Sequence, residues 1–227
     1  SAVALAFNQD YDKDPAMAEY ITNADFRRAL SMAIERDQIN EAFFLGLGRP
    51  SSPCAWPDPP YAPGEEYDQL YHQLDVEEAN RLLDSIGLDQ KDSEGFRLLP
   101  NGERVVIEMM AVSGAFFDYP GIGEMFGQHW KNNVGIASEV QAVERSLRNT
   151  RLTNNDTMTN FWGADNSEGV FLFPNHVFAY QCESGTGTLS GQWFQDHSIG
   201  REPTGPIREQ QLAFEEGSKL PREERIP

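Results

Sequence analysis

Helix-type and strand-type hydrophobic patterns alternate along this chain, and this alternation constrains the fold more than any other feature of the sequence. Apolar residues at three- and four-residue spacing predict helices after Asn23, after Asp75, at about 121–133, around 144–151 and at about 207–216. Short apolar runs predict strands at 3–8, 136–143 and 157–161. Helices that alternate with strands are typical of a layered α/β domain.

Local signals define several of the connections. Asp75 followed three residues later by Glu78 is a capping-box pattern, and Gly87 is the expected left-handed end of that helix. Asn101-Gly102, between the apolar runs 96–99 and 105–107, predicts a β-hairpin because both residues tolerate positive φ. Prolines between 50 and 63 predict an ordered loop or extended connection, and the Gly/Ser/Thr-rich stretch 181–205 predicts a long loop.

The charge balance excludes several classes of partner. The 227 residues include 36 acidic and 18 basic side chains, which gives a net charge of −18. Nucleic acid is not expected as a partner, because phosphate binding needs clustered Lys and Arg. An anionic membrane surface is disfavoured for the same reason. Since no run of 18 apolar residues occurs, we expect no membrane-spanning segment.

Motifs for cofactors, metals and nucleophilic catalysis are absent from the sequence. No glycine-rich phosphate loop or GxSxG elbow occurs, and the four histidines are scattered without metal-ligand spacing. We therefore expect no cofactor and no metal. Cys54 and Cys182 can form one disulfide in an oxidising compartment or remain two separate thiols.

Two carboxylates, Asp165 and Glu168, suggest the acid pair of a glycoside hydrolase. Such chemistry needs two carboxyl groups at a set separation across a sugar, one of them with a raised pKa. In a chain with 36 acidic residues, an acidic loop explains the pair more simply.

The segment Trp162-Gly163-Ala164-Asp165 is the binding-site candidate that the residues themselves indicate. It follows the predicted strand 157–161, at the end of a strand where open α/β sheets place their ligands. Trp162 offers a flat apolar face, and Asp165 offers an anchor for an ammonium group. The alternative is that Trp162 belongs to the core and that Asp165 begins a turn.

Several segments, in order, resemble the family 5 extracellular solute-binding proteins that feed oligopeptide, dipeptide and nickel importers. They are 26–39 (FRRALSMAIERDQI), 46–50 (GLGRP), 78–87 (EANRLLDSIG), 95–103 (GFRLLPNGE), 134–136 (VGI), 155–158 (NDTM) and 162–165 (WGAD). The sequence departs from the family pattern at Glu35, where aspartate is usual, and at 166–169, where NSEG replaces a "pDp" turn.

The resemblance implies a type II periplasmic-binding-protein fold whose two lobes close on a solute like a hinged clamp. The chain, 1–227, is expected to be a single domain, namely much of the second lobe with a mixed sheet flanked by helices. The other lobe would lie before Ser1 and after Pro227. The resemblance also implies a binder and not an enzyme. The resemblance implies that this binder works outside the cytoplasmic membrane with the permease subunits of an ABC transporter. In a host that lacks an outer membrane, a lipid anchor outside 1–227 would attach it to the membrane.

The resemblance also gives roles to site residues. Asp165 matches the aspartate that pairs with a peptide's α-ammonium group, and Trp162 resembles the tryptophan that lines a side-chain pocket, with Gly163 and Ala164 between them. The arginine often found three residues before that tryptophan is replaced by Thr159. Arg148 or Arg151 can serve an anionic end of the ligand, without a motif match.

The expected function is the capture of a peptide-like solute. Some relatives of this family bind oligosaccharides, so a sugar-oligomer binder is the alternative, with Trp162, Trp130 or Trp193 stacking on pyranose faces. A carboxylate-dependent glycoside hydrolase is the third hypothesis.

Overall fold

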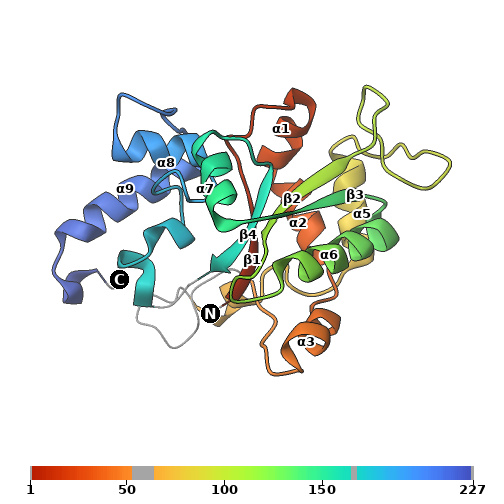
Figure 1. Cartoon of the computed structure of the whole chain (residues 1–227), viewed down its shortest axis with the longest axis horizontal. Helices are drawn as coiled ribbons and strands as arrows, with labels where there is room; N and C mark the ends of the chain where they lie inside the picture. Colours follow the sequence, from red (N-terminus) through yellow and green to blue (C-terminus); the bar gives the residue numbers. More distant parts are fainter. Residues whose placement is uncertain (1, 53–63, 165–167, 226–227) are drawn as a thin grey trace.

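The computed structural model describes residues 2–52, 64–164 and 168–225. They form a four-stranded mixed sheet with helices packed on it (Figure 1). The strands, in the sheet order β1-β4-β2-β3, are β1 (Ala2–Phe7), β4 (Thr159–Ala164), β2 (Val106–Val112) and β3 (Ala137–Val143). β2 lies parallel to both β3 and β4, whereas β1 lies antiparallel to β4. The predicted mixed sheet flanked by helices is confirmed.

The helices fall largely where the hydrophobic pattern predicts them. The α-helices are α1 (Pro15–Thr22), α2 (Ala24–Met32), α3 (Arg36–Phe44), α4 (Glu65–Asp68), α5 (Val76–Ser85), α6 (Tyr119–Val134), α7 (Arg145–Thr153), α8 (Thr188–Gln195) and α9 (Pro206–Lys219). Short 3₁₀ turns lie at Glu168–Phe171, Pro174–His176 and Arg222–Glu224. The predictions for α2, α5, α6, α7 and α9 are confirmed, whereas the sequence patterns did not single out α1, α3 or α4.

Capping side chains fix the starts of α2 and α5 as expected. The Asn23 side chain accepts a hydrogen bond from Asp25 N at 2.8 Å, and Asp75 Oδ1 accepts one from Glu78 N at 3.0 Å. The second hydrogen bond of the predicted capping box, from Asp75 N to the Glu78 side chain, does not form, however. The Asp75 N–H donates to the Met32 carbonyl, and Glu78 pairs with Arg81 at 2.5–2.6 Å. Tertiary contact with α2 therefore takes the donor that the local motif would have used.

The prediction of one long loop at 181–205 is wrong, because α8 lies inside it. Asp10, in the turn after β1, accepts hydrogen bonds from Ser190 N at 2.6 Å and from Ser190 Oγ at 2.9 Å. These bonds join residues 180 positions apart and satisfy a free N–H in the first turn of the helix. The local composition carries no sign of this contact.

The predicted hairpin turn is present, but its pairing is short. Gly102 has a φ of 87°, and Leu99 N donates to the Glu103 carbonyl at 2.7 Å. The arms meet in one isolated bridge, Leu98 with Arg104, and Arg97 of the first arm also bridges to Lys91. The second arm then continues as β2, whose partners are the parallel strands β3 and β4. The run 96–99 is therefore no full strand.

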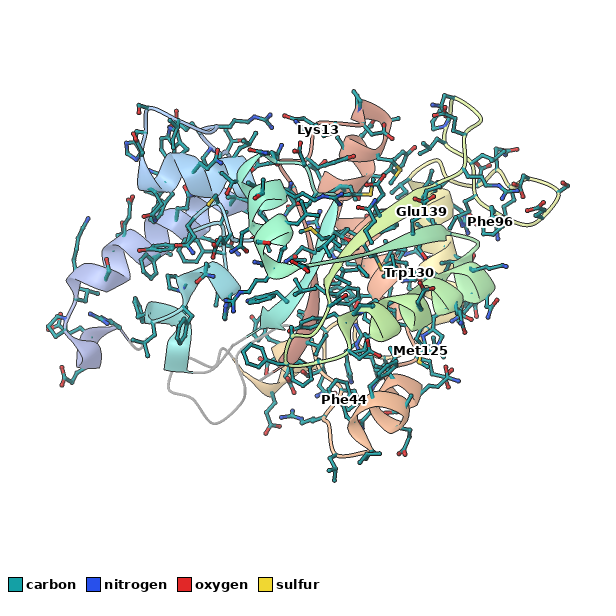
Figure 2. The ribbon with its side chains drawn as sticks, in the orientation of Figure 1. Lys13, Phe44, Phe96, Met125, Trp130 and Glu139 are labelled. Atoms are coloured by element: carbon teal, nitrogen blue, oxygen red, sulfur yellow. The ribbon has the colours of Figure 1, made fainter. Side chains whose placement is uncertain are left out.

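Alternate residues of the central strands face two hydrophobic layers. On one face, α6 covers the sheet, and Phe126 meets Phe161 edge-on with ring centroids 5.2 Å apart. Trp130 of α6 is 1% exposed, and its indole N–H donates to the Leu30 carbonyl. Figure 2 shows Trp130 on this helix. On the other face, Met110 packs in a smaller cluster with Val143 of β3 and Leu152 of α7. The sheet therefore lies between α6 and α7.

Two expectations fall partly outside the described residues. Cys54 lies in 53–63, which the structure does not describe, so one disulfide with Cys182 and two separate thiols both stay as alternatives. The single-domain assignment of 1–227 stays a prediction. Within the described part, no helix is both long and apolar enough to cross a membrane.

Candidate binding site at the carboxyl edge of the sheet

The parallel strands β2, β3 and β4 end at one edge of the sheet, where the chain leaves Val112, Val143 and Ala164. The amino end of β1 reaches the same edge, because β1 runs antiparallel to β4 (Figure 1). Carboxyl ends of parallel strands are the usual ligand-binding edge of such sheets. Trp162, Gly163 and Ala164 of the candidate segment lie at this edge.

The structure corrects where that segment begins. Trp162, Gly163 and Ala164 do not follow the strand but form its last three residues, opposite Ala4, Val3 and Ala2 of β1. The prediction that the strand ends at Phe161 is wrong because β1, far away in the sequence, provides hydrogen-bonding partners up to Ala164. Asp165 lies outside the described residues.

The Trp162 ring is half-buried between an aromatic ring and two guanidinium groups. Tyr119, the first residue of α6, stacks at 6.3 Å between ring centroids with an interplanar angle of 27°. The Cζ atom of Arg148 lies 4.1 Å from the indole centroid, and that of Arg145 lies 5.2 Å from it. These are cation–π distances. Both arginines come from α7, one turn apart, so they reach the same ring.

Arg148 is 3% exposed, and its hydrogen bonds go to neutral groups. Its Nε donates to Asn160 Oδ1 at 2.9 Å and its Nη1 to Asn149 Oδ1 at 3.0 Å. Burial lowers the pKa of Arg148 to about 10; Glu183 opposes this shift, whereas Arg145 adds to it. The guanidinium is therefore still charged at neutral pH. It forms no ion pair with any residue that the structure describes.

Motif reasoning found Trp162 but not its surroundings. Arg148 was considered only as a possible anion contact, and Tyr119, Arg145 and Asn160 were not singled out. Two arginines three residues apart in the helix after β3 were the available signal, because such residues share one helix face. Arg151, the other arginine considered, instead donates to Gln141 in the edge strand β3.

Two other tryptophans do not fit the role of sugar platforms. Trp130 is 1% exposed in the core, so it cannot stack on a solute. Trp193 is stacked on His197 with ring centroids 4.2 Å apart, and the Cζ atom of Arg208 lies 5.1 Å from its ring centroid. Of the three tryptophans considered, Trp162 alone lies at the carboxyl edge of the sheet.

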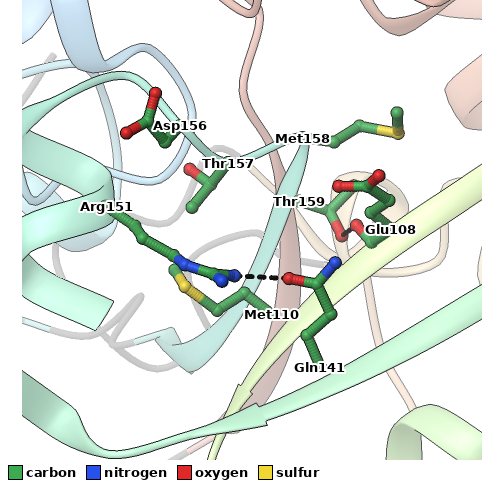
Figure 3. Close-up of a pocket in the computed structure, with 8 residues that line it drawn as sticks. All are labelled: Glu108, Met110, Gln141, Arg151, Asp156, Thr157, Met158 and Thr159. Carbon is green, nitrogen blue, oxygen red and sulfur yellow. Dashed lines mark hydrogen bonds between the residues drawn. The ribbon is translucent and has the colours of Figure 1, made fainter. Parts of the chain in front are cut away.

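A small hollow of about 10 Å³ lies near the start of β4 rather than at its carboxyl end (Figure 3). It is lined by Glu108, Met110, Gln141, Arg151, Asp156, Thr157, Met158 and Thr159. Polar groups of its wall bond within the protein: Arg151 donates to Gln141, and Thr159 Oγ1 donates to the Glu108 carbonyl at 2.7 Å. The hollow is therefore separate from the Trp162 site.

The remaining site hypotheses concern carboxylates and histidines. The side chains of Asp165 and Glu168 lie outside what it describes, so the separation of their carboxyl groups is not defined. In the described ranges, no group of three or more His, Cys, Asp and Glu side chains is placed to hold a metal ion. His129 is nearly buried and bonds to Gln38 at 2.6 Å, which is a structural contact.

Comparison with known families identifies the chain's relatives. Residues 1–180 match the family model "Bacterial extracellular solute-binding proteins, family 5 Middle". The chain belongs to this family. The ordered motifs therefore reflect true membership, and the family is one of solute binders.

Individual relatives differ in the solutes that their names state. The oligopeptide-binding protein OppA has 26% identity and a TM-score of 0.77 over 95% of this chain and 36% of its own. A periplasmic alpha-galactoside-binding protein of Rhizobium meliloti is 30% identical over 95 residues, which is 40% of this chain and 13% of that protein. A periplasmic oligopeptide-binding protein of Thermotoga maritima, solved with mannohexaose, has 18% identity and a TM-score of 0.70, covering 99% of this chain and 39% of its own. The chain thus spans well under half of each of these relatives.

Proposed function

We propose that the chain is part of the substrate-binding component of an ABC importer, and that this component captures a peptide-like solute by closing two lobes around it. The observation that carries the proposal is the position of Trp162: a half-buried indole at the carboxyl edge of the sheet, in a member of a solute-binding family. This edge would face the other lobe, so a solute held against Trp162 would be enclosed on closure.

The proposed ligand contacts are Trp162, Gly163, Ala164 and Asp165. Trp162 would provide an apolar wall for a side chain, and the Asp165 carboxylate would pair with the α-ammonium group of a peptide. Such a charge-assisted hydrogen bond becomes stronger when closure removes water from it. No group in this scheme needs to react with the solute, so the proposed role is binding and not catalysis.

An oligosaccharide ligand is the second candidate, and specific relatives favour it. The alpha-galactoside-binding protein and the mannohexaose-bound structure are both similar to this chain. The indole of Trp162 could stack on a pyranose ring, although its contacts with Tyr119 and two arginines limit the free ring surface. These charged neighbours favour an ionic solute over a neutral sugar.

Isothermal titration of the full-length protein tests the proposal. Peptides of two to five residues should bind, and neutral cello-, xylo- and galacto-oligosaccharides should bind far more weakly. Release of a cleaved product from any of these compounds would instead indicate a hydrolase. Tight binding of a neutral oligosaccharide without peptide binding would replace the peptide proposal with the sugar one.

Replacement of Asp165 tests the proposed ammonium anchor. In the full-length protein, Asp165→Ala should weaken peptide binding by about 2–5 kcal/mol, since one partner of a buried charge pair is removed. Asp12→Ala is a suitable control, because Asp12 forms surface ion pairs with Lys13 and Arg201. Equal peptide affinities for Asp165→Ala and the unmodified protein would remove Asp165 from the site.

We further propose that the protein works outside the cytoplasmic membrane and delivers its solute to the permease subunits of the transporter. The support is the extracellular character of the family. A lipid anchor outside these residues would hold the protein at the membrane in a host without an outer membrane.

A further inference from the structure

The guanidinium of Arg148 donates fewer hydrogen bonds than that of Arg97, which is also nearly buried. Arg97 uses all three side-chain nitrogens, with Val134 O, Asp84 Oδ1 and Asn80 Oδ1 among its acceptors. Arg148 uses Nε and Nη1, both for side-chain amide oxygens. Among the described residues, its Nη2 has no hydrogen-bond partner, and this atom is not sealed from solvent.

A second donor without an acceptor lies beside it. Asn160 Oδ1 accepts from Arg148 Nε, which directs Nδ2 of the same amide elsewhere. In the described structure, Asn160 Nδ2 is buried and has no hydrogen-bond partner. A buried donor without an acceptor is costly, and the charged hydrogen bond from Arg148 Nε is what holds the Asn160 amide in this orientation. A negatively charged acceptor would be the most favourable partner for Arg148 Nη2.

The local charges favour the same kind of ligand. Arg145 and Arg148 lie on the same Trp162 ring, and neither is paired with a described carboxylate. Two neighbouring cations disfavour each other, and a bound anion would relieve that repulsion. A carboxylate has the planar shape that a guanidinium matches best.

We infer that Arg148 and Asn160 form a receptor for a carboxylate group of the solute, next to Trp162. Arg148 Nη2 is the donor to the solute, Asn160 is a positioning residue that holds the guanidinium in place through its amide oxygen, and Arg145 adds positive charge at the rim. The inference rests on the proposed peptide function and narrows it to solutes that carry a carboxylate, either at the C-terminus or on an acidic side chain.

The first experiment compares matched peptides by isothermal titration with the full-length protein. The probes are a tripeptide acid, its C-terminal amide, and the same amide carrying one Glu side chain. The unmodified protein should bind the acid about 10- to 100-fold more tightly than the plain amide, as expected for a hydrogen bond between charged groups. Recovery of affinity by the Glu-containing amide would assign the receptor to a side-chain carboxylate, and no recovery would assign it to the C-terminus.

Two variants connect this preference to the receptor. Arg148→Met should remove the preference for the acid and leave the affinity for the amide within about threefold. Asn160→Asp is nearly isosteric and places a carboxylate against Arg148 inside the protein, so it should also remove the preference while the melting temperature stays the same or rises. This second variant keeps the inference testable if Arg148→Met does not fold. Arg208→Met is the matched control, because Arg208 also lies over an indole, that of Trp193, and should leave all affinities unchanged.

The outcomes separate the two proposals. Binding of peptides with equal affinity for acid and amide would overturn the carboxylate receptor and leave the peptide function intact. The same conclusion would follow if either Arg148→Met or Asn160→Asp kept the full preference, or if Arg148→Met weakened acid and amide equally. Failure of the unmodified protein to bind any of the peptides would overturn the proposed function and the receptor together.

Discussion

Replacing Arg97 should destabilise the chain more than replacing any surface arginine. Its side chain is 1% exposed and joins three parts of the fold: Nε donates to Val134 O at the end of α6, Nη1 to Asp84 and to Leu88 O, and Nη2 to Asn80 Oδ1 in α5. Arg97→Met keeps much of the side-chain volume but removes every one of these donors.

The size of the stability loss follows from the acceptors that Arg97→Met leaves without a donor. Val134 and Leu88 are fully buried, so their carbonyl groups lose a partner that water cannot easily replace. Each such group costs about 1–3 kcal/mol. The Asp84 carboxylate adds little, because its side chain is 54% exposed and water can solvate it. The expected loss in the free energy of unfolding is about 3–5 kcal/mol, a large part of the roughly 5–15 kcal/mol of a typical domain.

Urea denaturation followed by circular dichroism measures this loss. With a urea dependence of about 2–3 kcal/mol per molar, the midpoint should fall by about 1–2 M. Arg104→Met is the matched control: Arg104 also bonds to carboxylates, Asp92 and Glu94, but is 40% exposed, so its loss should cost less than about 1 kcal/mol. Equal midpoints for the two variants would refute the argument that burial and orphaned carbonyls decide the cost.

Two further predictions concern a buried histidine and two glycines. His129 Nδ1 accepts a hydrogen bond from Glu35 N at 3.3 Å, and burial lowers the pKa of His129 in the folded chain. As the pH falls, the imidazole is therefore protonated in the unfolded chain before it is protonated in the folded chain. The free energy of unfolding should then fall as the pH drops below the ordinary pKa of histidine. Melting temperatures between pH 7 and 5 should therefore fall less steeply in His129→Gln, and parallel curves would contradict this. Both Gly135 and Gly87 have positive φ, but a Cβ at Gly135 would lie 2.3 Å from the Gly95 carbonyl oxygen, whereas a Cβ at Gly87 would have no atom within 4 Å. Gly135→Ala should therefore lower the free energy of unfolding by about 1–3 kcal/mol more than Gly87→Ala does. Urea midpoints that agree for both glycine variants would show that close approach does not matter there.

Local patterns succeeded where neighbouring residues decide the structure. Asn23 and Asp75 cap the helices that follow them, and Gly135 ends α6 in the left-handed conformation. Each of these features depends on contacts within about four residues, which a sequence displays directly. The boundaries of α2, α5 and α6 could be predicted for this reason.

Long-range contacts explain the predictions that failed. The strand containing Trp162 extends to Ala164 because β1 pairs with it, and α8 forms in a Gly/Ser/Thr-rich stretch where Asp10 binds Ser190. Composition records intrinsic preference, which tertiary contacts can override.

The sequence by itself determined the α/β class, the order of the main elements, the acidic character of the chain and, through its ordered motifs, its family. The tertiary structure alone decided what surrounds Trp162: Tyr119 from α6 and Arg148 from α7 meet at its ring, and Asn160 from the same strand holds Arg148 there. The physical reason is distance along the chain. Periodicity and caps report contacts between near neighbours, whereas a binding site is made by side chains that approach one another only after the sheet and helices have packed.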